Sequence, residues 1–138
     1  PLYSTTVRAL AAGVGSASFT AVFGGQLPDM LAAVLAGVLV FIVGHMTQPN
    51  IGVFLRAWAG GITATFTAIA ANRLAPQVAL DMVIVGGIMI LVPGVATTNA
   101  LRDLMSGELL AGLSRGGEAI GIAAAVAGGV LFGLAVAF

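Results

Sequence analysis

The feature that most constrains this chain is the length of its uninterrupted apolar runs. From Ala9 to Pro28 the sequence carries no charged side chain, and comparable apolar runs follow to the C-terminus. A helix needs about 20 mostly apolar residues to cross the hydrocarbon core of a bilayer, where it satisfies its own backbone groups. Barrel strands would instead alternate polar and apolar residues over about ten positions. The runs therefore predict an all-α membrane protein.

These runs predict a polytopic transmembrane helix bundle with about five spans, forming a single transmembrane domain over residues 1–138. Pro, Gly and Asn mark expected turns at residues 24–29 and 45–52, and Asp29 is placed to cap the helix that follows it. Further turns are expected at residues 73–77 and 106–108. The expected spans are residues 7–24, 30–46, 53–72, 78–95 and 118–138, with an amphipathic connector over about 97–116.

Composition excludes several classes of protein. Hydrophobic residues make up 59% of the chain and charged residues 7%, whereas a soluble domain carries about 25% charged residues. The net charge of zero gives no basis for a nucleic-acid partner. With no cysteine and one histidine, the chain offers no disulfide and no metal site, and no nucleophilic triad or phosphate loop is present. We expect no cofactor and no enzyme activity.

The arginines suggest an orientation. If the N-terminus is cytoplasmic, then Arg8, Arg56, Arg102 and Arg115 all lie on the cytoplasmic side and Arg73 alone lies outside. Because cytoplasmic loops carry the excess of Arg and Lys, we expect a cytoplasmic N-terminus.

Small residues spaced four apart predict helix faces that pack closely. They form three stripes: Ala12, Ser16 and Thr20; Ala57, Gly61 and Thr65; Ala125, Gly129 and Gly133.

The fourth span is expected to break at Pro93 and Gly94. Proline removes a backbone donor and clashes with the preceding turn, and glycine permits unusual dihedrals. Non-helical backbone at membrane depth survives only where protein or a water-filled cavity covers it, and broken helices often build transporter binding sites. The alternative is a simple helix stop.

Polar residues follow this break. Thr97 or Thr98 is expected to cap a new helix, on which Asn99, Arg102 and Asp103 share one face. Arg102 suits a carboxylate, which it can bind through two parallel hydrogen bonds. The alternative is an interfacial loop in which Arg102 anchors to lipid headgroups.

Three carboxylates are candidates for proton coupling: Asp81, Asp103 and Glu118. A carboxylate in apolar surroundings can carry a proton near neutral pH, although Asp81 could equally cap its helix. Arg115, three residues before Glu118, is the expected ion-pair partner of Glu118. His45 is expected at the membrane interface, and Trp58 in an aromatic belt.

Residues 86–119, GGIMILVPGVATTNALRDLMSGELLAGLSRGGEA, resemble the signature region of the threonine/serine exporter family, and the layout of the earlier spans is similar. The matching positions are Val92, Pro93, Gly94, Thr98, Asn99, Ala100, Leu101, Arg102, Asp103, Gly107, Glu108, Gly112, Arg115, Glu118 and Ala119.

The resemblance implies an inner-membrane secondary transporter that exports small amino acids in exchange for protons. Members are either single chains with two membrane halves or split pairs, in which a five-span subunit joins a smaller partner and which are linked to dicarboxylate export. This chain resembles the five-span half. Members usually carry a cytoplasmic segment before the first span, whereas here the first apolar run begins near residue 7.

The resulting hypothesis is a proton-coupled exporter of threonine, serine or a related carboxylate. Because five spans enclose little volume, a second copy or a second membrane subunit is expected. The alternative is a structural or assembly subunit of a larger membrane complex. Substrate binding is assigned to Pro93, Gly94, Thr97, Thr98, Asn99 and Arg102, and proton coupling to Asp81, Asp103 and Glu118.

Overall fold

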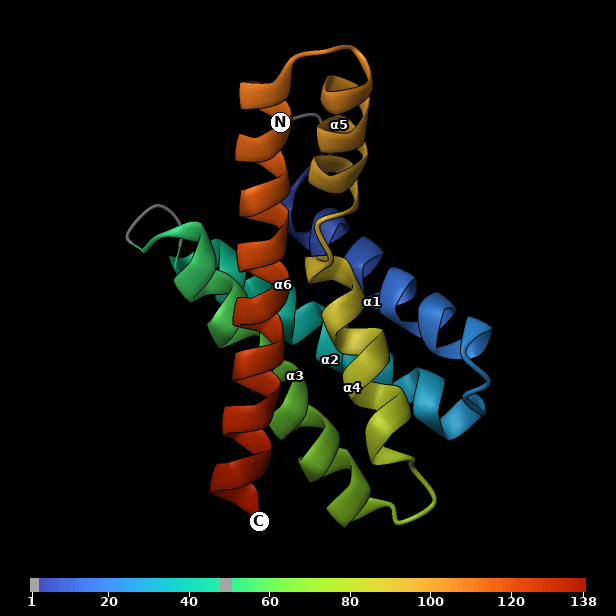
Figure 1. The fold of residues 1–138 in the computed structure, drawn as a ribbon. Helices are drawn as coiled ribbons and strands as arrows, with labels where there is room; N and C mark the ends of the chain where they lie inside the picture. Colours follow the sequence, from blue (N-terminus) through green and yellow to red (C-terminus); the bar gives the residue numbers. More distant parts are fainter. Residues whose placement is uncertain (1–2, 48–50) are drawn as a thin grey trace.

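The computed structural model describes residues 3–47 and 51–138, and this part of the chain is helical throughout its regular structure, with no strand (Figure 1). The predicted all-α class is confirmed. The middle of the expected turn at residues 45–52 lies outside the described residues. In chain order the elements are α1 (Thr5–Val22), α2 (Leu27–Thr47), α3 (Val53–Leu74), α4 (Leu80–Ile88), the 3-10 helix η1 (Met89–Leu91), α5 (Gly94–Met105) and α6 (Leu109–Ala137).

Three of these helices, α2, α3 and α6, are long and apolar enough to cross a membrane. The bent pair formed by Leu80–Leu91 and Gly94–Met105 makes a fourth candidate if it counts as one span. The expected first span, α1, has 18 residues with Arg8 in its first turn and is not among these candidates. The expected count of five spans is therefore approximate, and the polytopic helical class stands.

The structure differs from the expected connector over residues 97–116. α6 begins at Leu109 and runs for 29 residues without a break, so the separate link before the last span does not exist. The turn expected at residues 106–108 is present and reverses the chain. Gly107 has φ 86°, its N–H donates to Leu104 O at 3.2 Å, and the Glu108 N–H donates to Asp103 O at 2.9 Å. This pair of bonds is the common closing motif of a helix end, and it lays α5 along the first half of α6 (Figure 1).

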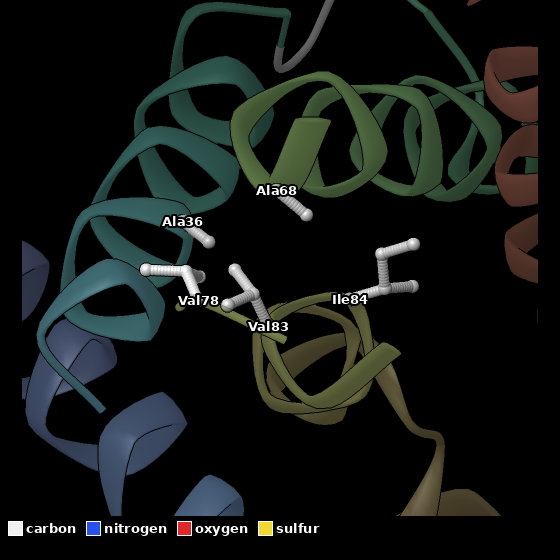
Figure 2. Packing of buried hydrophobic residues seen from close by; sticks show 5 residues of the cluster. All are labelled: Ala36, Ala68, Val78, Val83 and Ile84. Carbon is white, nitrogen blue, oxygen red and sulfur yellow. The ribbon is translucent and has the colours of Figure 1, made fainter. Parts of the chain in front are cut away.

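The core lies where α4 packs among α1, α2 and α3. Figure 2 shows its buried side chains, which come from α2, α3, α4 and the residues just before α4. All are small or β-branched, so the helices can approach closely. The cluster consists of Ala36, Ala68, Val78, Val83 and Ile84.

The predicted stripes of small residues lie at helix contacts. Most of their members are buried: Ser16 and Thr20 on α1, Ala57, Gly61 and Thr65 on α3, and Gly129 and Gly133 on α6. At the crossing of α3 and α6 the backbones themselves meet, because a Cβ on Gly61 would lie 2.5 Å from Val126 O. Trp58 also packs at this crossing, with its ring centroid 5.1 Å from that of Phe132.

Asp29 links the start of α2 to the start of α4. Asp29 as a whole residue is only 4% exposed. Oδ2 accepts a hydrogen bond from Gln26 N at 2.9 Å, and Oδ1 accepts one from Ala79 N at 2.7 Å. α2 begins at Leu27, so Asp29 lies in its first turn and not before the helix as expected; its carboxylate binds the N–H of Gln26, just before α2, and also the N–H at the start of α4, which is 50 residues away in the sequence.

Candidate functional site

The chain breaks at the position that Pro93 and Gly94 predict. α4 ends at Ile88, η1 covers Met89–Leu91, and the axes on either side of the break differ by 53°. Val92 N donates to Met89 O at 3.3 Å, and Gly94 N turns back to Val92 O at 2.8 Å. The carbonyl of Ile90 thus loses the donor that Gly94 would supply in a continuous helix.

The two threonines after the break do not cap α5. The helix already begins at Gly94, with Pro93 at the cap position and no side-chain cap. The Thr97 hydroxyl donates to Pro93 O at 2.7 Å and the Thr98 hydroxyl to Gly94 O at 2.9 Å. Both threonines are exposed, and their oxygens can still accept hydrogen bonds.

The polar residues of α5 divide between two environments. Arg102 is exposed, whereas Asn99 and Asp103 are half-buried. Asp103 faces α6, where its Oδ2 lies 3.0 Å from Nη1 of Arg115, an ion pair without a hydrogen bond. Arg115 therefore pairs with Asp103 across the hairpin, and not with Glu118 as expected from their spacing.

The two halves of this ion pair should respond differently to mutation. The Arg115 side chain is 52% exposed and can be hydrated alone, whereas Asp103 Oδ2 is buried. We expect Asp103→Asn to lower the free energy of unfolding by no more than about 1 kcal/mol, and Arg115→Ala by about 2 kcal/mol, because the latter leaves a buried charge unpaired. Thermal unfolding of the purified variants measures both, and equal losses would contradict this asymmetry.

Neither of the other two candidate carboxylates makes a salt bridge among the described residues. Asp81 is exposed in the first turn of α4, at the far end of that helix from the break. Its Oδ1 accepts a hydrogen bond from Met82 N at 2.9 Å, which fits the alternative of a residue near a helix cap. Glu118 is exposed on α6. The structure thus does not gather the three candidates at one point.

A cavity of about 640 Å³ lies between α5 and α6. Pro93 and Thr97 border it, but Thr98, Asn99 and Arg102 are not among its lining residues, and its wall is otherwise apolar. The predicted substrate-binding residues therefore divide between this cavity and the exposed face of α5.

A second cavity, of about 550 Å³, lies beside the break and is lined from α1, α2, α3, η1 and α6. Ile90 and Leu91 border it from the broken segment. Its polar lining consists of Arg8, His45 and Arg56, which were not predicted to lie together. The order of the spans was nevertheless enough to predict this grouping. In a bundle of consecutive spans, the starts of the first and third spans and the end of the second lie at the same end.

Comparison with known proteins decides the family. A family model described as "Putative threonine/serine exporter" matches residues 1–137. The chain belongs to the threonine/serine exporter family. Within it, the chain is similar to a protein of Mycobacterium tuberculosis (strain ATCC 25618 / H37Rv) named "Probable threonine/serine exporter", with 30% identity over 111 residues. No solved structure matches the chain.

Membership of this exporter family, together with the apolar helices, makes the chain a multi-pass membrane protein whose helices contact lipid. The matched region covers 80% of this chain and 21% of the M. tuberculosis exporter. The chain therefore spans about a fifth of the length of that relative.

Proposed function

We propose that this chain is one half of a proton-coupled secondary transporter of the inner membrane, with its N-terminus in the cytoplasm. It would export threonine, serine or a related small carboxylate. The observation that carries the proposal is the break at Pro93, where a 53° bend lies next to two cavities. Broken membrane helices with cavities beside them are a recurrent way to build a transporter site, and the family is one of exporters.

Substrate binding is assigned to the start and the polar face of α5. Arg102 is exposed and takes no part in the ion pair of Asp103, so its guanidinium group can bind a carboxylate through two hydrogen bonds. The hydroxyl hydrogens of Thr97 and Thr98 are already donated to the backbone, which leaves their oxygens to accept from an ammonium group. Asn99 would contact the substituent of the substrate, and Pro93 and Gly94 would shape the break.

Proton coupling is assigned to Asp81, Asp103 and Glu118. Asp103 has the clearest physical consequence, because a proton on its carboxylate would remove the attraction to Arg115 across the hairpin. Asp81 and Glu118 are exposed, Asp81 in the first turn of α4 and Glu118 one helical turn from Arg115 on α6, and both would exchange protons directly with their surroundings.

A second membrane half is part of the proposal. Alternating access usually needs two repeats that rock about a central site. Here Thr97, Thr98 and Arg102 are exposed, so the chain alone does not enclose its substrate. A second copy or a partner subunit would cover this face of α5.

The test is efflux from proteoliposomes that hold this chain, alone and with any membrane partner that copurifies with it. We expect a pH gradient to drive efflux of threonine, serine or succinate. Arg102→Ala should reduce this efflux at least about tenfold, because one charge-assisted contact to the carboxylate is lost. Arg73→Ala is the matched control, since Arg73 is also exposed but lies at the other end of the bundle.

If no preparation shows efflux driven by the pH gradient, the transport proposal is wrong and a structural subunit becomes the better reading. If efflux is present but unchanged in folded Arg102→Ala protein, the assignment of the substrate to α5 is wrong.

A further inference from the structure

The cavity beside the break gathers positive charge. Arg8 from α1, His45 from α2 and Arg56 from α3 all line it. Among the described residues of its lining none is acidic, and the salt bridge found in the described part of the chain involves none of these three. The rest of the wall consists of apolar side chains and one glycine, which keep the local dielectric low and strengthen attraction to an anion.

Arg56 is the least exposed of the three charged or titratable side chains that line the cavity. Its Nε atom is buried, yet it has no hydrogen-bond partner among the described residues. Nearly all buried polar atoms in folded proteins are hydrogen-bonded, and an unsatisfied one destabilises the structure. Arg56 also lines the cavity, so a carboxylate bound there would accept hydrogen bonds from the terminal N–H groups of its guanidinium group.

The other two groups are held at the rim by an aromatic ring. The guanidinium carbon of Arg8 lies 5.3 Å from the centroid of the Phe41 ring, and the ring of His45 stacks on Phe41 at 6.0 Å. This cation–π contact orients Arg8 without a carboxylate, so its N–H donors remain available. Both Arg8 and His45 are exposed, so the rim is open to an incoming solute.

We propose that this cavity binds the carboxylate group of a small organic solute, with Arg56 as the inner donor and Arg8 and His45 at the rim. The volume of about 550 Å³ falls within the range of about 300–1,000 Å³ that is usual for small-molecule sites. A carboxylate fits because guanidinium groups bind it through paired N–H donors. The site shares no residue with the face of α5, and the inference rests neither on transport nor on Arg102.

The test is direct binding by the chain purified in neutral detergent, measured by thermal stabilisation and by calorimetry. The probes are malonate, the neutral malonamide of similar shape, and threonine as a zwitterion. We expect malonate to bind and to raise the unfolding temperature, and malonamide to do neither. Binding of threonine with the same dependence on Arg56 would place the amino-acid carboxylate in this cavity.

The decisive variant is Arg56→Gln, which should weaken malonate binding at least about tenfold. It should not lower the unfolding temperature of the ligand-free protein, because it removes a buried N–H that has no partner. Arg8→Gln should also weaken malonate binding. Because Arg8 is exposed, this variant can replace Arg56→Gln as the test if Arg56→Gln does not fold. Arg73→Gln is the control, because Arg73 lies on the same helix as Arg56 but at its other end and does not line the cavity.

Equal malonate affinity in the wild type, Arg56→Gln and Arg8→Gln would overturn the proposal. So would binding of malonamide as tight as that of malonate. Added phosphatidylglycerol tests a lipid as the ligand instead. If this lipid raises the unfolding temperature of the wild type but not of Arg56→Gln, and malonate does not bind, the cavity holds a lipid phosphate and the proposal is wrong.

Discussion

Gly129→Ala is expected to lower the free energy of unfolding by about 3 kcal/mol or more, the upper end of the usual cost of overpacking. The reason is the crossing of α3 and α6. A Cβ on Gly129 would overlap the carbonyl oxygen of Trp58 and would lie 3.2 Å from Ile62 N. Both are backbone atoms of α3, so no side chain can rotate away and the two helices must separate.

The matched control is Gly128→Ala on the same turn of α6. A Cβ there would lie 3.7 Å from Cδ1 of Trp58, which is an ordinary contact. Thermal unfolding in detergent, followed by the fluorescence of Trp58, compares the two variants. If Gly129→Ala unfolds at the same temperature as Gly128→Ala, then α3 and α6 do not meet backbone to backbone.

Asp29→Ala is expected to lower the free energy of unfolding by about 2–4 kcal/mol. The variant removes the acceptor of two backbone N–H groups, those of Gln26 and Ala79, and does so at a position that is 4% exposed. Because the carboxylate joins the starts of α2 and α4, both helix ends lose their cap together. Asp29→Asn keeps one carbonyl acceptor, so its free energy of unfolding should lie between those of Asp29→Ala and the wild type.

Asp81→Ala is the control for this effect. Asp81 is also in the first turn of α4, but it is exposed and binds only the N–H of the next residue. The unfolding temperature of Asp81→Ala should stay close to that of the wild type, since surface substitutions usually change stability by no more than about 0.5 kcal/mol. Equal losses for Asp29→Ala and Asp81→Ala would mean that the link between α2 and α4 contributes nothing.

The helical class and the break followed from the sequence because both depend on local chemistry. Long apolar runs leave the backbone no arrangement but a helix, and Pro93 cannot donate to the turn before it. The start of α6 could not be predicted from the sequence in this way. Arg115 and Glu118 suggested where the chain leaves the lipid, but a charged side chain does not end a helix, and α6 continues back to Leu109.

The candidate site was only partly predictable for a related reason. Spacing along α5 put Asn99, Arg102 and Asp103 on one face, but the partner of Asp103 depends on how α5 folds back on α6. The cavity with Arg8 and Arg56 depends on the packing of four helices and η1. No local pattern joins these two arginines, which are 48 positions apart.

The length of α6 determines where along the bilayer normal α5 can contact a solute. At about 1.5 Å per residue, 29 residues reach roughly 43 Å, or about 40 Å along the bilayer normal at a tilt of about 20°. The hydrocarbon layer is about 30 Å thick, so roughly 10 Å of the helix stands clear of the acyl chains. If that overhang is at the N-terminal end, where α5 runs beside α6, Arg102 stands among the phosphates and would meet a charged metabolite before it leaves water.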